Sequence, residues 1–173
     1  RPSDKLWLFE LHSTDQPLLR QALGHAGRRA QIEARDGFAG LTAVLPPQPR
    51  RGLILIDPSY ELKEDYRHVI DALKDGLKRF ATGTYAVWYP MLQRAESKQL
   101  PDKLKRLLVT SWLHATLSVR APNPEGYGMH GSGMFIINPP WTLAETLRAA
   151  LPWLAETLSQ GEGSGFTLEQ QGA

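Results

Sequence analysis

The sequence predicts a single α/β domain, and two observations lead to this. Short apolar runs of strand length alternate along the chain with longer stretches whose apolar residues recur at helical spacing. The chain has 173 residues, of which 42% are hydrophobic, and this is enough to bury one core. Residues 1–160 are therefore expected to form the domain, followed by a polar C-terminal tail at 161–173.

Composition excludes several classes of protein. The chain has no cysteine, so disulfides and thiolate metal sites are not available. No apolar run approaches the roughly 20 residues of a membrane span, and the N-terminus lacks a signal-peptide pattern. The net charge of +2 allows a polyanionic partner without requiring one. We therefore expect a soluble, cytoplasmic protein.

The elements follow the order of a parallel sheet with connecting helices. Strands are expected at residues 6–9, 30–33, 53–56, 84–89, 113–119 and 134–137. Helices are expected at residues 15–23, 38–45, 62–80, 100–108 and 143–158. Within 62–80 the apolar residues fall three and four positions apart, a stripe that packs on a sheet.

The end of the third strand carries the residues that are most informative about function. Leu53–Ile56 is followed by Asp57, Pro58, Ser59 and Tyr60. Because Pro58 cannot continue the ladder, Asp57 and an exposed Tyr60 ring are expected at the carboxyl end of the strand, where open α/β sheets bind ligands. Asp-Pro-Pro-Tyr and its variants mark enzymes that methylate an exocyclic amine of adenine or cytosine. The alternative is an ordinary turn, since Asp-Pro-Ser is common turn chemistry.

Such an amine is a poor nucleophile, because its lone pair is delocalised into the ring. The Asp57 carboxylate and the Pro58 carbonyl could accept hydrogen bonds from its two N–H groups and hold the nitrogen in line with a methyl donor. Tyr60 would stack on the flipped base, a contact of about 1–3 kcal/mol. The reaction would be a direct transfer without a covalent enzyme intermediate.

Other strand ends fit a Rossmann-like class I methyltransferase sheet, in which the last strand inserts antiparallel. Its second strand ends in an acidic residue that binds the ribose hydroxyls of S-adenosyl-L-methionine, and Glu10 stands at the end of the first strand visible here. After the next strand, Asp36 could accept from the adenine amino group, while Gly37 lets the backbone approach. Taken one at a time, Glu10 is more simply explained as a solvated strand end, and Asp36-Gly37 as a turn. Their order along the chain, before Asp57, favours the cofactor site.

Longer motifs carry a more specific resemblance. They lie at residues 10–12, 15–20, 36–38, 50–61, 78–90 and 132–141. Together they resemble the RlmJ family of bacterial 23S ribosomal RNA adenine-N6 methyltransferases along nearly the whole chain. The resemblance implies a monomer that methylates a specific adenine of 23S rRNA without a metal. Its implied catalytic residues are Asp57, Pro58 and Tyr60, and its implied cofactor-binding residues are Glu10, Asp36, Gly37 and Asp57.

The chain departs from the family pattern in two places. The family's N-terminal portion, with the first strand and its glycine-rich cofactor loop, has no counterpart before Arg1. The sheet is therefore expected to be N-terminally incomplete, with a gap between the Glu10 strand and the Asp57 strand. Ser59 replaces the usual proline and loosens the backbone before Tyr60, which predicts weakened rather than lost catalysis.

A second motif of similar form follows the last strand, at Asn138-Pro139-Pro140-Trp141. No cofactor-binding strand comes after it, so we expect a strand exit and a helix entry.

Candidate substrate contacts are less specific. Tyr127, His130 and Ser132 in a glycine-rich loop could touch substrate, although flexible-loop composition explains them equally well. The better phosphate-contact candidates among the basic residues are Lys98, Lys103, Lys105 and Arg106, for which a solvated helix face is the simpler explanation. The alternative functions are a DNA adenine-N6 methyltransferase and a non-catalytic RNA-binding fragment.

Overall fold

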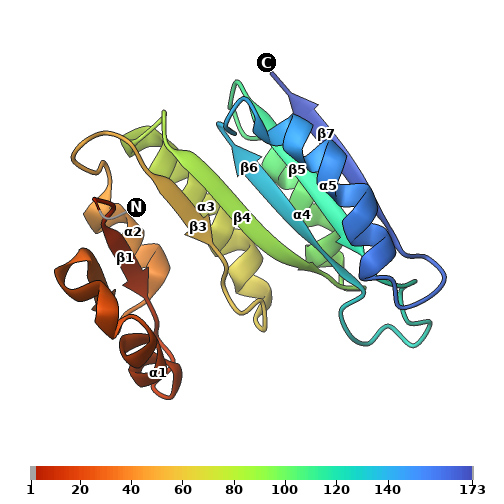
Figure 1. The fold of residues 1–173 in the computed structure, drawn as a ribbon, viewed down its shortest axis with the longest axis horizontal. Helices are drawn as coiled ribbons and strands as arrows, with labels where there is room; N and C mark the ends of the chain where they lie inside the picture. The colour runs from red at the N-terminus through yellow and green to blue at the C-terminus, as the bar shows by residue number, and fades with distance from the viewer. Residues whose placement is uncertain (1–2, 173) are drawn as a thin grey trace.

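The computed structural model describes residues 3–172 as a layered α/β structure (Figure 1). In chain order the elements are β1 (Leu6–Phe9), α1 (Asp15–Ala22), the 3₁₀ helix η1 (Gly24–Arg29), β2 (Ala30–Glu33), α2 (Gly37–Val44), β3 (Leu53–Ile56), α3 (Lys63–Arg79), β4 (Thr84–Met91), α4 (Ala95–Lys105), β5 (Trp112–Ser118), β6 (Gly131–Ile137), α5 (Leu143–Thr157) and β7 (Gly165–Gln171). No helix within 3–172 has the length and apolar character that crossing a membrane requires.

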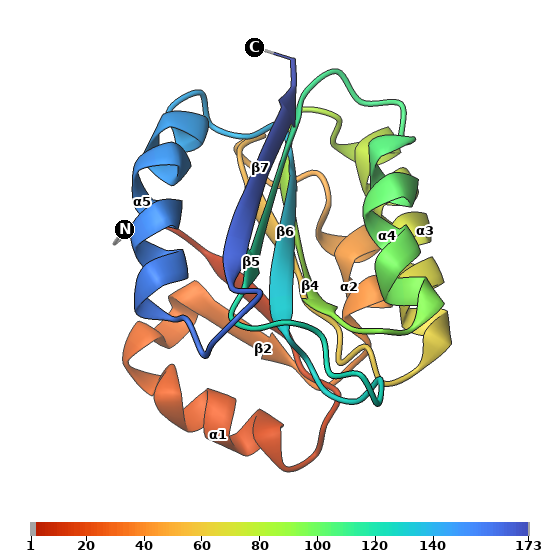
Figure 2. The same cartoon turned by 90° about the vertical axis from the view of Figure 1, so that its right-hand side faces the viewer.

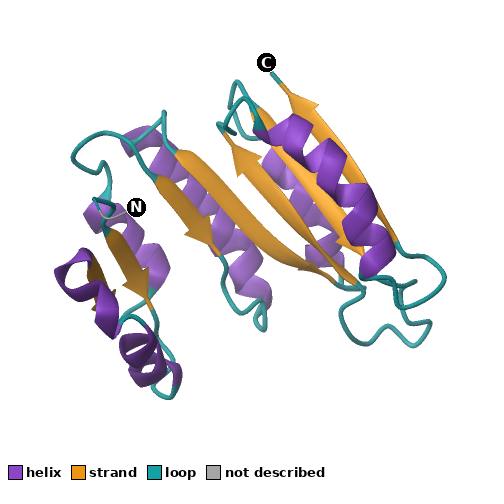
Figure 3. Cartoon of the chain, viewed as in Figure 1, coloured by secondary structure: helices purple, strands orange, loops and turns teal. Residues whose placement is uncertain are grey.

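The strands form two separate sheets, as Figure 3 shows in orange. β1 and β2 pair in parallel, and the second sheet has the order β3-β4-β6-β5-β7. β3 and β4 are parallel, whereas β6 runs antiparallel between β4 and β5. The predicted architecture is confirmed: the fold is α/β with a mixed sheet into which β6 is inserted antiparallel. Within the described residues, no strand fills the predicted gap between β1 and β3.

The segment expected to be a polar tail is instead a strand. Of residues 161–173, Gly165–Gln171 form β7, which pairs antiparallel with β5. Glu169 also pairs with Lys105 of α4, with Oε2 at 2.8 Å from Nζ, while Oε1 lies 3.6 Å from Nδ1 of the buried His114. An edge strand gains its stability from ladder hydrogen bonds and keeps one face in water, so its polar composition did not reveal it.

β6 begins three residues earlier than its apolar run suggested. Its first residues include Gly131 and Gly133, which in sequence are typical of a loop. A Cβ at Gly133 would overlap the Tyr89 ring on β4, and a Cβ at Gly131 would overlap the carbonyl of Leu117 on β5. The glycines are therefore strand positions that allow close packing.

The main core lies between the second sheet and helices α2, α3 and α4, on the side opposite α5 (Figure 2). Tyr85, Val87 and Tyr89 alternate along β4 toward this core. A smaller core joins Leu151 of α5 to the other face of β4, β5 and β6.

Over β3, this second face is uncovered. Leu53 and Leu55 are 71% and 62% exposed and line an apolar groove of about 320 Å³ beside the gap between the sheets.

The β1–β2 unit is joined to the rest of the molecule through α2. The Phe9 ring of β1 lies against Gly40, where any Cβ would overlap it. On its other side, Leu41 of α2 and Leu45, directly after the helix, enter the main core, which also holds Val69 of α3. This packing sets where the end of β2 lies relative to the end of β3.

Candidate active site

The predicted site residues follow strands that point the same way. Figure 1 shows the arrowheads of β1 and β3 directed toward the same edge, and β2 and β4 run parallel to these two strands. Glu10, Asp36 and Asp57 therefore follow strand ends along the carboxyl edge of the two sheets. In open α/β sheets this is the edge where ligands bind.

Asp57 leaves β3 directly after Ile56, which pairs with Val87 of β4. Its carboxylate is solvent-exposed, and partial burial raises its pKa above the ordinary value. Within residues 3–172 it accepts no hydrogen bond and forms no ion pair, and the carbonyl of Pro58 accepts no hydrogen bond either. The two acceptors that the sequence assigns to an amine are therefore not used by other protein groups.

Tyr60 corrects one prediction, because its ring is buried rather than exposed. Only 2% of the residue is accessible, and its hydroxyl donates to the carbonyl of Trp88 at 2.6 Å. The ring also contacts Tyr66, with centroids 4.9 Å apart. Burial raises the pKa of Tyr60, and the Asp57 charge raises it further, so the phenol remains a neutral donor. The physical reason is the backbone: φ of +55° at Tyr60 turns the chain so that the ring folds beneath the loop.

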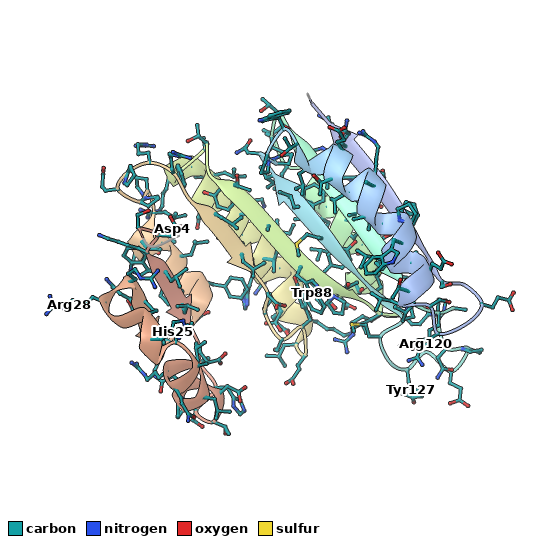
Figure 4. The ribbon with its side chains drawn as sticks, in the orientation of Figure 1. Asp4, His25, Arg28, Trp88, Arg120 and Tyr127 are labelled. Carbon is teal, nitrogen blue, oxygen red and sulfur yellow. The ribbon has the colours of Figure 1, made fainter. Side chains whose placement is uncertain are left out.

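Arg94 is a site residue that sequence reasoning missed. It lies directly before α4, and its Nη1 donates to the carbonyls of Tyr60 and Glu61 at 3.2 and 3.3 Å. Trp88, labelled in Figure 4, extends from β4 with its ring centroid 6.4 Å from that of Tyr60. The Asp57 loop is thus held from β4 and from the start of α4. No local motif signals this, because Arg94 is more than thirty residues from its partners.

Glu10 and Asp36 each retain a free carboxylate oxygen. Oε1 of Glu10 accepts from the His12 N–H at 2.7 Å, and Oδ1 of Asp36 accepts from the Phe38 N–H at 2.9 Å, capping α2. The second oxygen of each carboxylate accepts no hydrogen bond within the described residues. These two groups, with Gly37 beside Asp36, fit a ligand that presents hydroxyl and amino donors, such as a nucleoside.

Asn138 lies at the other edge of the sheet, as predicted for a strand exit. Its Nδ2 donates to the carbonyls of Ala81 and Gly83, both at 2.8 Å, and its own carbonyl accepts from Thr84 Oγ1 at 2.9 Å. Trp141 is 90% exposed, and α5 begins two residues later. This motif ties the end of β6 to the start of β4.

Comparisons with known proteins show the family of this chain. A model of the family described as "Ribosomal RNA large subunit methyltransferase D, RlmJ" matches residues 1–169. The ribosomal RNA large subunit methyltransferase J of Haemophilus influenzae is 44% identical over 98% of this chain and 59% of its own length. The Escherichia coli protein of the same name is 46% identical over 91% of this chain and 56% of its own length.

A solved structure extends the likeness to three dimensions. The crystal structure of a Legionella pneumophila protein is similar with a TM-score of 0.87 at 37% identity, covering 99% of this chain and 62% of that chain. The chain thus spans less than two thirds of the length of these relatives. Its match to the family model, together with its identity to two curated members, shows that the chain belongs to the RlmJ family of ribosomal RNA large subunit methyltransferases.

Proposed function

We propose that the natural protein containing this chain transfers a methyl group from S-adenosyl-L-methionine to N6 of a specific adenine in 23S rRNA. Membership of the RlmJ family supports the reaction class and the substrate. The observation that carries the proposal is the pair of unused acceptors, the Asp57 carboxylate and the Pro58 carbonyl, at the carboxyl end of β3. Such a pair matches the two N–H groups of an adenine amine.

In the proposed reaction these acceptors hold the amino group of a flipped adenine. Hydrogen bonds to Asp57 and Pro58 draw electron density onto the nitrogen and direct its lone pair away from the ring. When bound, the cofactor would supply an electrophilic methyl group on sulfur. A nitrogen–carbon bond would form as the carbon–sulfur bond breaks, and the amine would then lose one proton to Asp57 or to water. Direct transfer of this kind needs neither a metal nor a covalent enzyme intermediate.

We infer a positioning role for Tyr60. Its hydroxyl bond to Trp88 and its backbone bond from Arg94 hold the loop that presents Asp57. Stacking of its ring on the base would require the ring to leave its buried position.

For the cofactor we propose contacts from Glu10 to the ribose hydroxyls and from Asp36 and Gly37 to the adenine, with Asp57 nearby. The free oxygens of the two carboxylates support this assignment. We further propose that the enzyme acts as a monomer in the cytoplasm.

The test is methyl transfer from labelled S-adenosyl-L-methionine to unmodified 23S rRNA, with this chain and the full-length natural protein assayed in parallel. Labelled N6-methyladenine in RNA, but not in DNA of matching sequence, is the expected result. Labelling of the DNA instead would favour the DNA methyltransferase. RNA binding without transfer by either protein would favour the non-catalytic module.

A further inference from the structure

Strands β4, β5 and β6 meet beside the proposed active site, at a junction that has no role in the proposed reaction. The backbone of His130 joins the ends of β4 and β5 at the start of β6: its N–H donates to the Met91 carbonyl at 3.3 Å, and its carbonyl accepts from the Val119 N–H at 2.9 Å. β5 runs parallel to β4, so this junction lies on the carboxyl edge, where Asp57 also emerges. Figure 2 shows the β5–β6 loop and the β3–α3 loop at the same end of the molecule.

Three basic side chains gather at this junction. Ser97, directly before Lys98, accepts from the Leu92 N–H at 3.0 Å and donates to the Pro90 carbonyl at 2.7 Å, so Lys98 starts beside the end of β4 to which His130 bonds. Burial lowers the pKa of His130, and the positive charges of Lys98 and Arg120 lower it further. Lys98 Nζ donates to Oε1 of Gln93 at 2.6 Å, and Arg120 Nη2 donates to the Met129 carbonyl at 3.3 Å. Both of these acceptors are neutral. Within residues 3–172 neither cation has a carboxylate partner, so their charge is not balanced locally.

His130 adds a second, independent observation. The residue is only 9% exposed, and its Nδ1 is buried without a hydrogen-bond partner among the described residues. A buried polar atom without a partner is costly and uncommon in proteins. Turning the imidazole toward the surface would let this nitrogen donate to a ligand oxygen at the junction where Lys98 and Arg120 lie.

The loop above this junction presents an aromatic ring. Tyr127 is 76% exposed and stands between Gly126 and Gly128, both with φ of +82°. Figure 4 shows the labelled side chains of Arg120 and Tyr127 in this same loop region. A free cation beside an exposed aromatic ring is the combination by which proteins hold single-stranded nucleic acid, the cation contacting the backbone and the ring stacking on a base.

We propose that Lys98, Arg120 and His130 bind a phosphate of the RNA strand next to the target adenine, and that Tyr127 stacks on a neighbouring base. This inference rests on the proposed function, whose substrate is RNA. The spacing is suitable: β6 lies two strands from β3, so His130 is about 10 Å across the sheet from Asp57 and about 13 Å further along β4. A strand that crosses this edge can place one base at Asp57 while a nearby phosphate reaches the cations.

The test compares two double variants of the full-length natural protein that remove the same charges. Lys98→Ala/Arg120→Ala removes the proposed contacts. Lys78→Ala/Arg79→Ala removes one lysine and one arginine from the exposed end of α3, at the opposite edge of the sheet. Affinity for an unmodified single-stranded fragment of 23S rRNA is measured over a range of salt concentrations, and affinity for S-adenosyl-L-methionine is measured alongside.

In the first variant, the plot of log binding constant against log salt concentration should be less steep by about 1.4, because each phosphate contact to a single strand contributes about 0.7 to the slope. The control variant should leave the slope unchanged, and cofactor affinity should be unchanged in both. An unaltered slope in the Lys98→Ala/Arg120→Ala variant, in a protein that still methylates rRNA, overturns the site and leaves the proposed function standing. Conversely, a wild-type protein that shows the predicted slopes without methylating rRNA overturns the function and leaves the site standing.

The aromatic contact has its own control. Tyr127→Ala is expected to weaken RNA binding by about five-fold or more, the loss of one stacked base. Tyr127→Phe keeps the ring and should bind like the wild type. Trp141→Ala removes an even more exposed ring at the other edge of the sheet and should have no effect. Equal losses in Tyr127→Ala and Trp141→Ala would show that the ring contributes only general surface adhesion.

Discussion

Asp57-Pro58-Ser59-Tyr60 and Asn138-Pro139-Pro140-Trp141 are similar motifs that follow similar apolar strands, yet the structure uses them in opposite ways. The first leaves its side-chain acceptor free and buries its aromatic ring. The second commits its amide to two backbone carbonyls and leaves its ring 90% exposed. Strand direction explains the difference: β3 is parallel to β4, and β6 is antiparallel to it. A motif of this kind can act on a base only where its strand ends at the ligand-binding edge, with its acceptor unpaired.

The largest expected effect is a loss of methyl transfer, and it should follow from changes to the first motif only. In the full-length natural protein Asp57→Ala should lower the rate of methyl transfer by about 100-fold or more, because a positioned proton acceptor is lost. The fold should be retained, since no protein group bonds to this carboxylate. Transfer kinetics and circular dichroism check the two parts. Near-normal kinetics would remove Asp57 from the mechanism.

The aromatic rings of the two motifs, Tyr60 and Trp141, should differ in how much they stabilise the fold. Tyr60→Ala should lower the free energy of unfolding by about 3–5 kcal/mol, as expected when a buried aromatic side chain is removed. Tyr60→Phe should cost only about 1 kcal/mol, the loss of the hydrogen bond to Trp88. Trp141→Ala should change stability by less than about 0.5 kcal/mol. Urea unfolding of the three variants gives the values, and a small loss in Tyr60→Ala would show that the buried position is not the stable one.

Asn138 should matter for stability and not for chemistry. Asn138→Ala removes two hydrogen bonds and places alanine at φ of +51°, so we expect a loss of about 1–3 kcal/mol with an unchanged rate of transfer. Asn138→Gly is the matched control, since glycine accepts the same φ and loses only the hydrogen bonds. Equal stability of the two variants would assign the whole loss to the hydrogen bonds. A specific fall in the rate of transfer would instead place this motif in the active site.

The pH dependence should follow from the Asp57 carboxyl. Because burial raises its pKa, transfer should decline with falling pH at values above the ordinary aspartate pKa of 3.8. The same shift makes the protonated form relatively favourable in the folded protein. The protonated Asp57 carboxyl therefore contributes to stability below the ordinary pKa, and this contribution is lost as pH rises through the raised pKa. Asp57→Asn should therefore be slightly more stable than the wild type at neutral pH, as thermal unfolding at two pH values would show.

The smallest effect is expected at Ser59. Its N–H donates no hydrogen bond within residues 3–172, so Ser59→Pro removes no bond from the loop. Proline should stabilise the fold by about 0.4–1 kcal/mol by restricting the unfolded chain. It should also raise the rate of transfer modestly, by fixing the backbone between Asp57 and Tyr60. A slower variant would mean that the loop needs the freedom that serine allows.

Several features were predictable from the sequence because they depend on local chemistry. Apolar runs marked the predicted strands, and the position of Asp57 followed from the proline after β3. The burial of Tyr60 was not predictable, because it depends on a positive φ at a non-glycine residue and on a carbonyl of a later strand. β7 was missed because its side chains are mostly polar and its stability comes from pairing. The grouping of Lys98, Arg120 and His130 required the start of α4 and the two ends of the β5–β6 loop to meet at the end of β4.

The uncovered face over β3 has a consequence for handling the protein. β3 has no pairing partner on its outer edge among the described residues, and its exposed leucines border an apolar groove. An unpaired strand edge with apolar side chains is a template onto which another chain can add a strand. This chain on its own should therefore lose solubility as its concentration rises. Charged substitutions at Leu53 and Leu55 should restore solubility to the isolated chain.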